Sequence, residues 1–361
     1  MLKKAAAMFL VLPGIAMLLS CANTSTNFLY AALPSQNEIN AYREDPNSGV
    51  LTTLSITPIT AGEGVRSLLI HPSKKFMYAA NSVEDDISVY DLSVSGAITE
   101  KESSGRTPAG TTPSLLVMDK AGQFLYAANT GSNNISSFSI GSTDGSLTVT
   151  PGSPFTIGAE ALNMQVSPSG NFLYVTVGIA QSGTTGSIEV WPLTAGVLGQ
   201  IAQVLPTGTT PFGLAIHPNG NFLYTANFGD NSISEYTINS DGTLSVLGTV
   251  SSGLADLSSP VALLINNAGT FLYVANQSSS TVAGYTIGSD GSLALIPSSP
   301  TVITNSTPST IASDASGHYL YVGNNVNPAI ESFAVDLNTG ALTAVQSDRL
   351  GSTTTSLALT P

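Results

Sequence analysis

Cysteine and histidine are nearly absent from this sequence. Among the 361 residues the only cysteine is Cys21, so no internal disulfide can form and the fold must depend on packing alone. The three histidines are too far apart to have the spacing of a metal-ligand pair. We therefore expect no disulfide framework and no metal site, and no residue pattern indicates a cofactor.

Charged residues are also scarce. They make up 9% of the chain, and 10 Lys and Arg stand against 23 Asp and Glu, which gives a formal charge of −13. After Lys120 the only basic residue is Arg349. A nucleic-acid backbone is bound by clustered Lys and Arg, so we expect no nucleic-acid partner. The apolar content of 42% is nevertheless ample for a buried core.

The N-terminus carries one apolar run that is too short to span a membrane. Two lysines precede an apolar stretch over residues 5–19, whereas a spanning helix needs about 20 apolar residues. Cys21 follows the small Ser20 directly after this stretch. The pattern resembles that of bacterial lipoproteins, which implies a signal peptide over residues 1–20 and acylation of Cys21 after cleavage.

Lipidation of Cys21 would place the protein in the cell envelope. Residues 21–27 would form a lipidated linker, and residues 28–361 a single domain. We expect an exported, monomeric protein anchored to the membrane, in the outer membrane or facing the periplasm if the source is Gram-negative. The alternative is an incidental cysteine behind an ordinary cleavage site.

One short motif returns along the whole chain. Its clearest copy is HPNGNFLYTAN, residues 217–227. The tyrosine of its FLY core recurs at gaps of 48 to 50 residues, at Tyr30, Tyr78, Tyr126, Tyr174, Tyr224, Tyr273 and Tyr321. A repeat of this length is typical of a β-propeller blade. The sequence therefore predicts seven blades.

Each copy contains four short runs in which apolar and polar residues alternate, here named strands A to D. Around Tyr224 they are GLAIHP, FLYTAN, SISEYTI and TLSVL. Alternation with period two indicates strands, and dipeptides such as Asp241-Gly242 between strands C and D are typical of tight turns. The predicted fold class is all-β, a seven-bladed propeller with four antiparallel strands in each blade.

The two ends of the repeat array complement each other. The first copy starts at strand B, residues 28–30, and has no strand A before it. The last copy ends on TSLALTP, residues 355–361, which aligns with strand A and has no strand B after it. We expect this C-terminal strand to pair with the N-terminal blade and close the ring, which leaves no unpaired sheet edge.

Five copies end strand B in asparagine, namely Asn81, Asn129, Asn227, Asn276 and Asn324. Such a side chain can bond nearby backbone and fix the following loop. In the alternative interpretation the five amides line a polar ligand site on the loop face, the face that carries the B–C and D–A loops. His71 and His217 fall in A–B turns on the opposite turn face, where we expect structural roles.

The B–C loops contain two further features. The fourth copy has an enlarged loop over residues 178–186, and long loops on a rigid scaffold often carry function, although neutral variation is the alternative. Asp85, Asp86 and Asp230 lie in other B–C loops, but their spacing does not match a calcium cage. We expect these three to be solvated acids.

The blade strings indicate a family. FLYVANQSSSTVAGYTIGSDGSL and FLYTANFGDNSISEYTINSDGTL resemble the seven-bladed lactonase propellers, which include the propeller-type 6-phosphogluconolactonases, and the related YVTN-repeat proteins. The resemblance covers residues 27–361. It implies a central channel in which a histidine and arginines, at or just after the proline that begins certain A strands, act with a glutamate that follows a strand-B asparagine.

This chain departs from that pattern. The residues after the strand-A proline position are Arg66, Ser114, Leu162, Phe212, Val261, Ser309 and Thr355. Only Arg66 is charged, and neither the histidine nor the glutamate is found. Lactone hydrolysis needs a base for water and a donor for the developing oxyanion. Arg66 is the candidate donor and Glu63 or Glu160 the candidate base; alternatively, both glutamates are solvated or Glu63 pairs with Arg66.

Two functions are consistent with the sequence. One is a non-catalytic propeller that binds a small molecule, a glycan or a protein on its loop face, with Phe212 and the five asparagines as candidate contacts. The missing histidine and glutamate favour this function. The alternative is a lactonase-like hydrolase of a sugar lactone or small ester that uses Arg66.

Overall fold

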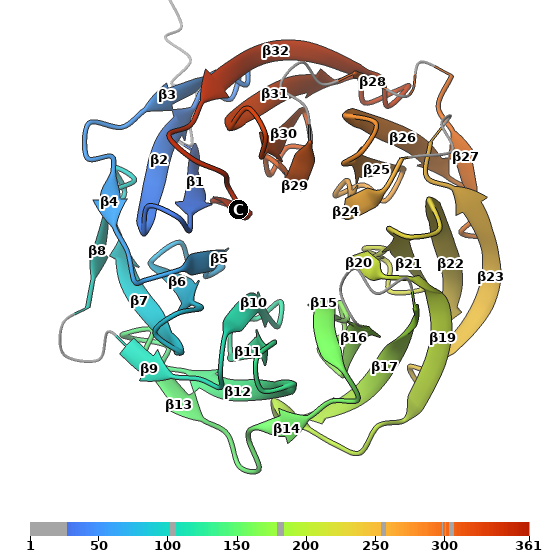
Figure 1. The fold of residues 1–361 in the computed structure, drawn as a ribbon, viewed down its shortest axis with the longest axis horizontal. Coiled ribbons are helices and arrows are strands. Elements are labelled where there is room, and N and C mark those ends of the chain that lie inside the picture. Colours follow the sequence, from blue (N-terminus) through green and yellow to red (C-terminus); the bar gives the residue numbers. More distant parts are fainter. Residues whose placement is uncertain are drawn as a thin grey trace, which may run out of the picture.

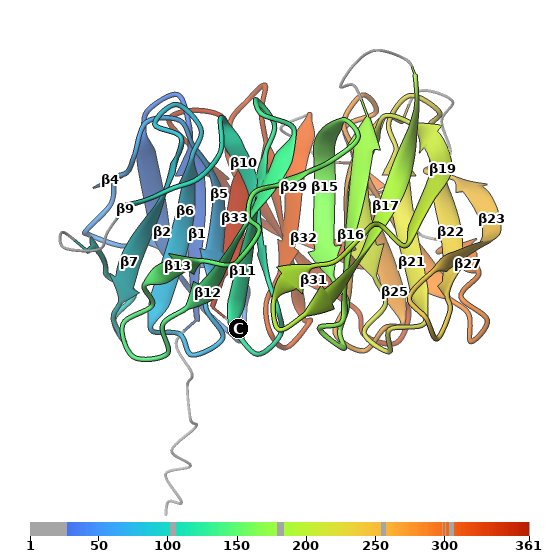
Figure 2. The same ribbon diagram turned by 90° about the horizontal axis from the view of Figure 1, so that it is seen from below.

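The described residues form a ring of seven sheets around a central axis (Figure 1). The computed structural model describes residues 27–101, 106–178, 184–253, 258–297, 299, 301–302 and 307–360. Seen from the side, the strands run between two opposite faces of a disc (Figure 2). Every regular element in these ranges is a strand, and they contain no helix that could span a membrane. The seven-bladed all-β prediction is confirmed.

Blades 1 to 3 follow the predicted order of strands A to D from the axis outward. Blade 1 consists of β33 (Ser356–Leu359), β1 (Asn27–Leu33), β2 (Glu38–Glu44), β3 (Leu51–Thr53) and β4 (Ile59–Thr60). Blade 2 consists of β5 (Val65–Ile70), β6 (Phe76–Asn81), β7 (Asp86–Leu92), β8 (Ile98–Glu100) and β9 (Arg106–Pro108). Blade 3 consists of β10 (Pro113–Met118), β11 (Phe124–Asn129), β12 (Asn134–Ile140), β13 (Leu147–Val149) and β14 (Phe155–Thr156).

Blades 4 to 7 repeat this order. Blade 4 consists of β15 (Glu160–Val166), β16 (Phe172–Gly178), β17 (Thr185–Thr194), β18 (Val197–Leu198) and β19 (Gln203–Thr209). Blade 5 consists of β20 (Pro211–Ile216), β21 (Phe222–Asn227), β22 (Ser232–Ile238) and β23 (Leu244–Ser251). Blade 6 consists of β24 (Pro260–Ile265), β25 (Phe271–Asn276), β26 (Thr281–Ile287), β27 (Leu293–Leu295) and β28 (Thr301–Val302). Blade 7 consists of β29 (Pro308–Ser313), β30 (Tyr319–Asn324), β31 (Ala329–Val335) and β32 (Leu342–Arg349).

The outer strand D differs from the prediction of one continuous strand in each blade. In blades 1, 2, 3, 4 and 6 it is split into two strands that both pair with strand C. Pro58, Pro154 and Pro297 lie at the breaks of blades 1, 3 and 6, and a proline cannot donate a hydrogen bond to the ladder. In blades 5 and 7 a single strand spans the whole edge.

The C-terminal strand closes the ring. β33 pairs antiparallel with β1, with Leu359 opposite Leu29 and Ser356 opposite Ala32. The Thr360 hydroxyl accepts a hydrogen bond of 2.9 Å from the backbone N–H of Phe28. The closure that the incomplete end copies predicted is therefore confirmed.

The hydrophobic core lies between the blades. Seven clusters of buried side chains fill the ring, and each cluster combines residues from two neighbouring blades. The repeat tyrosines are among the largest fully buried side chains, for example Tyr126 and Tyr224. Each blade therefore depends on both neighbours for burial of its apolar faces.

The FLY core holds each blade against the next blade's C–D turn. Tyr30 donates its hydroxyl hydrogen to the carbonyl of Gly96 at 2.7 Å, and five later tyrosines repeat this contact at 2.7–3.1 Å. At the closure, Tyr321 instead contacts Glu44 Oε1 at 2.9 Å and the Gly49 carbonyl at 3.4 Å. The motif is therefore a contact between blades.

The same turns require glycine. The glycines that face the repeat tyrosines have φ between 68° and 85°, and they are Gly49, Gly96, Gly145, Gly196, Gly242, Gly291 and Gly340. The aromatic residue two positions before each tyrosine covers the corresponding glycine; at Gly242 an added Cβ would lie 2.3 Å from the Phe172 ring. Only glycine combines this φ with such close contact.

Candidate central ligand site

A cavity of about 800 Å³ opens around the axis on the loop face. All seven residues that follow the strand-A proline position line it, namely Arg66, Ser114, Leu162, Phe212, Val261, Ser309 and Thr355. Each blade therefore contributes one of these side chains to a common space. Three residues that follow a strand-B asparagine, Thr130, Phe228 and Gln277, line the cavity as well.

A β-bulge in strand A directs these side chains toward the axis. In blades 2 to 7 the A–B ladder shifts register around one residue, and that residue is Arg66, Ser114, Leu162, Phe212, Val261 or Ser309. A bulge leaves one residue outside the ladder and can re-aim its side chain. Thr355 lies directly before β33 and takes the equivalent place in blade 1.

The backbone before each bulge is unusual. Five of the residues two positions ahead of the bulged residue have positive φ, and they are Gly64, Thr112, Thr210, Ser259 and Thr307. This conformation is rare for any residue other than glycine and rarest for β-branched residues such as threonine. The D–A loops therefore hold a fixed turn at the cavity mouth.

Arg66 and Glu160 line the same cavity, whereas Glu63 does not. Arg66 is exposed and Glu160, the first residue of β15, is half-buried. Within the described ranges Arg66 forms no ion pair, so the pairing with Glu63 that we considered does not occur. The exposed Glu63 uses its backbone N–H to donate to Glu84 Oε2 at 3.1 Å.

Two phenylalanines of blade 5 form an aromatic wall in the lining. The rings of Phe212 and Phe228 meet edge to face, with centroids 5.4 Å apart and planes at 79°. Asn163 Nδ2 donates to the Phe212 carbonyl at 2.9 Å and fixes the backbone of β20. The sequence named Phe212 as a contact but missed Phe228, which meets it within blade 5, and Asn163, which reaches it from blade 4.

The comparisons with known proteins identify the family. The family model for the seven-bladed lactonase β-propeller matches residues 23–155, 151–253 and 243–358, which together span almost the whole chain. The chain belongs to the lactonase family of seven-bladed β-propellers. No curated protein matches the lactonase propeller significantly in sequence.

Solved structures share the fold of this lactonase propeller at low identity. A candidate 6-phosphogluconolactonase from Bacteroides fragilis matches with a TM-score of 0.80 at 18% identity, over 94% of this chain and 99% of its own. The periplasmic gluconolactonase of Pseudomonas aeruginosa matches with a TM-score of 0.78 at 18% identity, over 93% and 99%. A Lactobacillus plantarum protein matches with a TM-score of 0.74 at 20% identity, over 92% and 99%. At such identities the likeness concerns the fold.

The five strand-B asparagines of the lactonase propeller are buried inside the blades. Asn81, Asn129, Asn227, Asn276 and Asn324 are each 0% exposed, and none lines the central cavity. Asn81 Nδ2, for example, donates to Asp86 Oδ1 at 2.7 Å and to Ser88 Oγ at 2.9 Å on strand C. The contacts of these buried side chains therefore favour a structural role for the five asparagines over a role in lining the ligand site.

Some acids of the B–C loops bond the backbone instead of being only solvated. Asp85 Oδ1 accepts a hydrogen bond from Thr112 N at 2.7 Å, and Asp230 Oδ2 accepts one from Thr209 N at 2.6 Å. The expectation of solvated acids is therefore wrong, because these carboxylates hold D–A loops that lead to the cavity. In the described part of the chain no group of three or more His, Cys, Asp or Glu could hold a metal ion.

The remaining sequence candidates lie away from the cavity or outside the described residues. His71 Nε2 lies 2.8 Å from the Gly122 carbonyl and His217 Nε2 lies 2.8 Å from the Gly269 carbonyl, so each histidine joins two A–B turns on the turn face. Cys21, with the predicted signal peptide, and most of the loop over residues 178–186 lie outside the described residues.

Proposed function

We propose that this lactonase propeller is an exported, membrane-anchored protein that binds a small polyhydroxylated ligand, such as a sugar or the end of a glycan, in its central cavity without hydrolysing it. The observation that carries the proposal is the cavity lining. It combines one arginine that has no ion pair among the described residues, one glutamate, amide and hydroxyl groups, and the Phe212–Phe228 wall. Sugars offer hydroxyls for such polar groups and C–H faces for aromatic rings.

The lining also supports binding over catalysis. Among the described residues that line the cavity there is no histidine, and the acidic and basic groups are Glu160 and Arg66, which come from blades 4 and 2. A hydrolase needs its base and its oxyanion donor close to one carbonyl group. The proposed binding function needs only that each group reaches a different part of the ligand.

Ligand binding is tested with the chain lacking residues 1–21. Isothermal titration against a panel of monosaccharides, sugar acids and oligosaccharides should find at least one ligand. Arg66→Ala and Phe212→Ala should each weaken its binding about tenfold, equivalent to about 1.4 kcal/mol. Lys74→Ala on the turn face is the control and should change nothing. A panel without any ligand, or a ligand insensitive to both cavity substitutions, contradicts the proposal.

Lactone hydrolysis is the second candidate, because Arg66 and Glu160 share one cavity and the Pseudomonas aeruginosa neighbour is named a gluconolactonase. In this reaction Glu160 would take a proton from water, and the resulting hydroxide would add to the lactone carbonyl. Arg66 would stabilise the oxyanion, the ring C–O bond would break as the carbonyl re-forms, and Glu160 would give its proton to the leaving ring oxygen to complete the hydroxy acid. Turnover of D-glucono-1,5-lactone that Glu160→Gln and Arg66→Ala both abolish would establish hydrolysis in place of simple binding.

Membrane anchoring is supported by the N-terminal sequence and by the position of Asn27. This residue begins β1 and pairs with Glu44 near the C–D turn of blade 1, so it lies on the turn face. A lipid on Cys21 would hold the turn face toward the membrane and leave the cavity mouth open on the far side. Cys21→Ala should move the protein from the membrane fraction to the soluble fraction, and a variant that stays with the membrane contradicts the anchor.

A further inference from the structure

The backbone segment that leads to Arg66 is held by both blades that it connects. Gly64 N donates to Asn37 Oδ1 of blade 1 at 2.8 Å, and Glu63 N donates to Glu84 Oε2 of blade 2 at 3.1 Å. Arg66 follows directly, as the bulged residue of β5. These two hydrogen bonds therefore hold the backbone two and three residues before Arg66.

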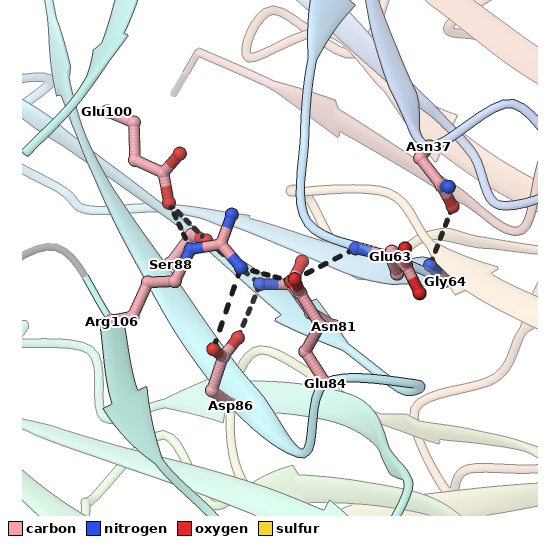
Figure 3. Close-up of polar contacts among 9 residues, drawn as sticks. All are labelled: Asn37, Glu63, Gly64, Asn81, Glu84, Asp86, Ser88, Glu100 and Arg106. Atoms are coloured by element: carbon pink, nitrogen blue, oxygen red, sulfur yellow. Dashed lines mark hydrogen bonds and ion pairs between the residues drawn. The ribbon is translucent and has the colours of Figure 1, made fainter.

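A single guanidinium holds the Glu84 carboxylate (Figure 3). Arg106, at the start of β9, forms an ion pair with Glu84 through Nη1, and its Nε donates to Glu100 Oε1 at 2.9 Å. Asp86 Oδ2 lies 3.7 Å from Arg106 Nη1. Three carboxylates from different parts of blade 2 thus share one cation.

The same network reaches the buried end of strand B. Asn81 Nδ2 donates to Ser88 Oγ at 2.9 Å, and Ser88 Oγ donates to Glu100 Oε1 at 2.8 Å (Figure 3). Burial raises the pKa of Asp86, although the Asn81 hydrogen bond and the Arg106 charge oppose that rise. The hydrogen bonds therefore run without a break from Asn81 through Arg106 to the segment before Arg66.

Other blades hold the corresponding amide without a cation. Thr111 N donates to Ser132 Oγ at 3.1 Å in blade 3, and Thr209 N donates to Asp230 Oδ2 at 2.6 Å in blade 5. Within the described ranges neither acceptor takes part in an ion pair. The ionic support belongs to the one segment that leads to the cavity's arginine.

We propose that Arg106, although it lies at the outer edge of blade 2, is a positioning residue that fixes Arg66 for ligand binding. Without Arg106 the carboxylates of Glu84, Asp86 and Glu100 repel one another, because no cation remains among them. Glu84 then moves away from the Glu63 amide, and the segment before Arg66 gains freedom. A cation that is already oriented loses less conformational freedom when a ligand binds, so Arg106 raises affinity without touching the ligand.

Amide hydrogen exchange on the full-length protein tests this link without any ligand. In Arg106→Gln the amides of Glu63 and Gly64 should exchange about tenfold faster, whereas the equivalent amides of Thr209 and Thr210 in blade 5 keep their rates. Lys101→Gln is the matched control. It breaks another ion pair of blade 2, between Lys101 and Asp91 at 2.8 Å, and should leave the Glu63 amide unchanged.

A second variant separates positioning from general damage. Glu84→Gln keeps an acceptor oxygen for Glu63 N and removes one of the repelling charges, so adding Arg106→Gln to it should speed exchange much less than tenfold. Unchanged exchange at Glu63 in Arg106→Gln, or an equal rise at Thr209, overturns the proposal. Only the effect of Arg106 on ligand affinity rests on the proposed cavity function. The exchange result does not, because a propeller that binds no sugar would still show it.

Discussion

The turn face and the loop face of this propeller are built in opposite ways. On the turn face every blade repeats one contact, in which an aromatic residue and a tyrosine hold the glycine of the next C–D turn. On the loop face blades 2 to 7 repeat one backbone device, the bulge of strand A, but the bulged residue is Arg, Leu, Phe or Val in four of them and Ser in two. Positions at which every blade carries the same residue type therefore belong to the scaffold. Equivalent positions at which the residue type differs from blade to blade belong to the site.

Removal of the closing strand should lower stability the most, because it takes away strand A of blade 1, which runs between the turn face and the loop face. Deleting residues 354–361 removes β33 and its ladder with β1. We expect a loss of about 5 kcal/mol or more in the free energy of unfolding, or roughly 10 °C in Tm. Thr360→Val is the control, since it removes only the bond to Phe28 N and should cost about 1 kcal/mol. An unchanged Tm after the deletion would refute closure.

A pair of glycine substitutions isolates the aromatic contact of the turn face. Gly242 and Gly170 both have positive φ, at 81° and 75°, but an added Cβ at Gly242 meets the Phe172 ring at 2.3 Å and one at Gly170 meets nothing within 4 Å. Gly170→Ala should cost only the left-handed strain of about 1–2 kcal/mol. Gly242→Ala should cost a further ~1–3 kcal/mol for the overlap. Equal losses in urea denaturation would show that the aromatic cover is unimportant.

The smallest expected effect on stability concerns Glu44, at the contact between blades 7 and 1. Its carboxylate accepts the Tyr321 hydrogen bond that a glycine carbonyl accepts in the other blades. Glu44 is 1% exposed, and burial raises its pKa although the Tyr321 hydroxyl bonds the carboxylate. A raised folded-state pKa means that Glu44 favours the fold most below its unfolded pKa of about 4.3, and that this contribution is lost as pH rises through the folded value. Glu44→Gln should flatten that decline between pH 4 and pH 7. An unaltered pH profile of urea denaturation would contradict the assignment.

Much of the scaffold could be predicted from the sequence because its determinants are local. Strand alternation, Asp-Gly turns and a tyrosine at constant spacing are all visible within one repeat, and the incomplete end copies indicate closure. The interrupted strand D was missed; in blades 1, 3 and 6 the break falls at a proline, and its place depends on where that proline lies relative to the ladder with strand C.

The site was predicted only in part. The seven cavity positions followed from the proline that begins strand A, and Glu160 was named with them. Glu63 does not line the cavity; it lies in the D–A loop three residues before the bulge at Arg66. Arg106 was missed because its three carboxylate partners meet only after β7, β8 and β9 are paired.

The bulges have a consequence for how such a ring can change. A bulged residue stands outside the hydrogen-bond ladder, so its replacement leaves the sheet intact, and six blades each offer one such position around a shared cavity. Selection, or a library randomised at these positions alone, can therefore rewrite the chemistry of the cavity one blade at a time. The side chains that line the cavity can therefore change without a change in the sheets that hold them.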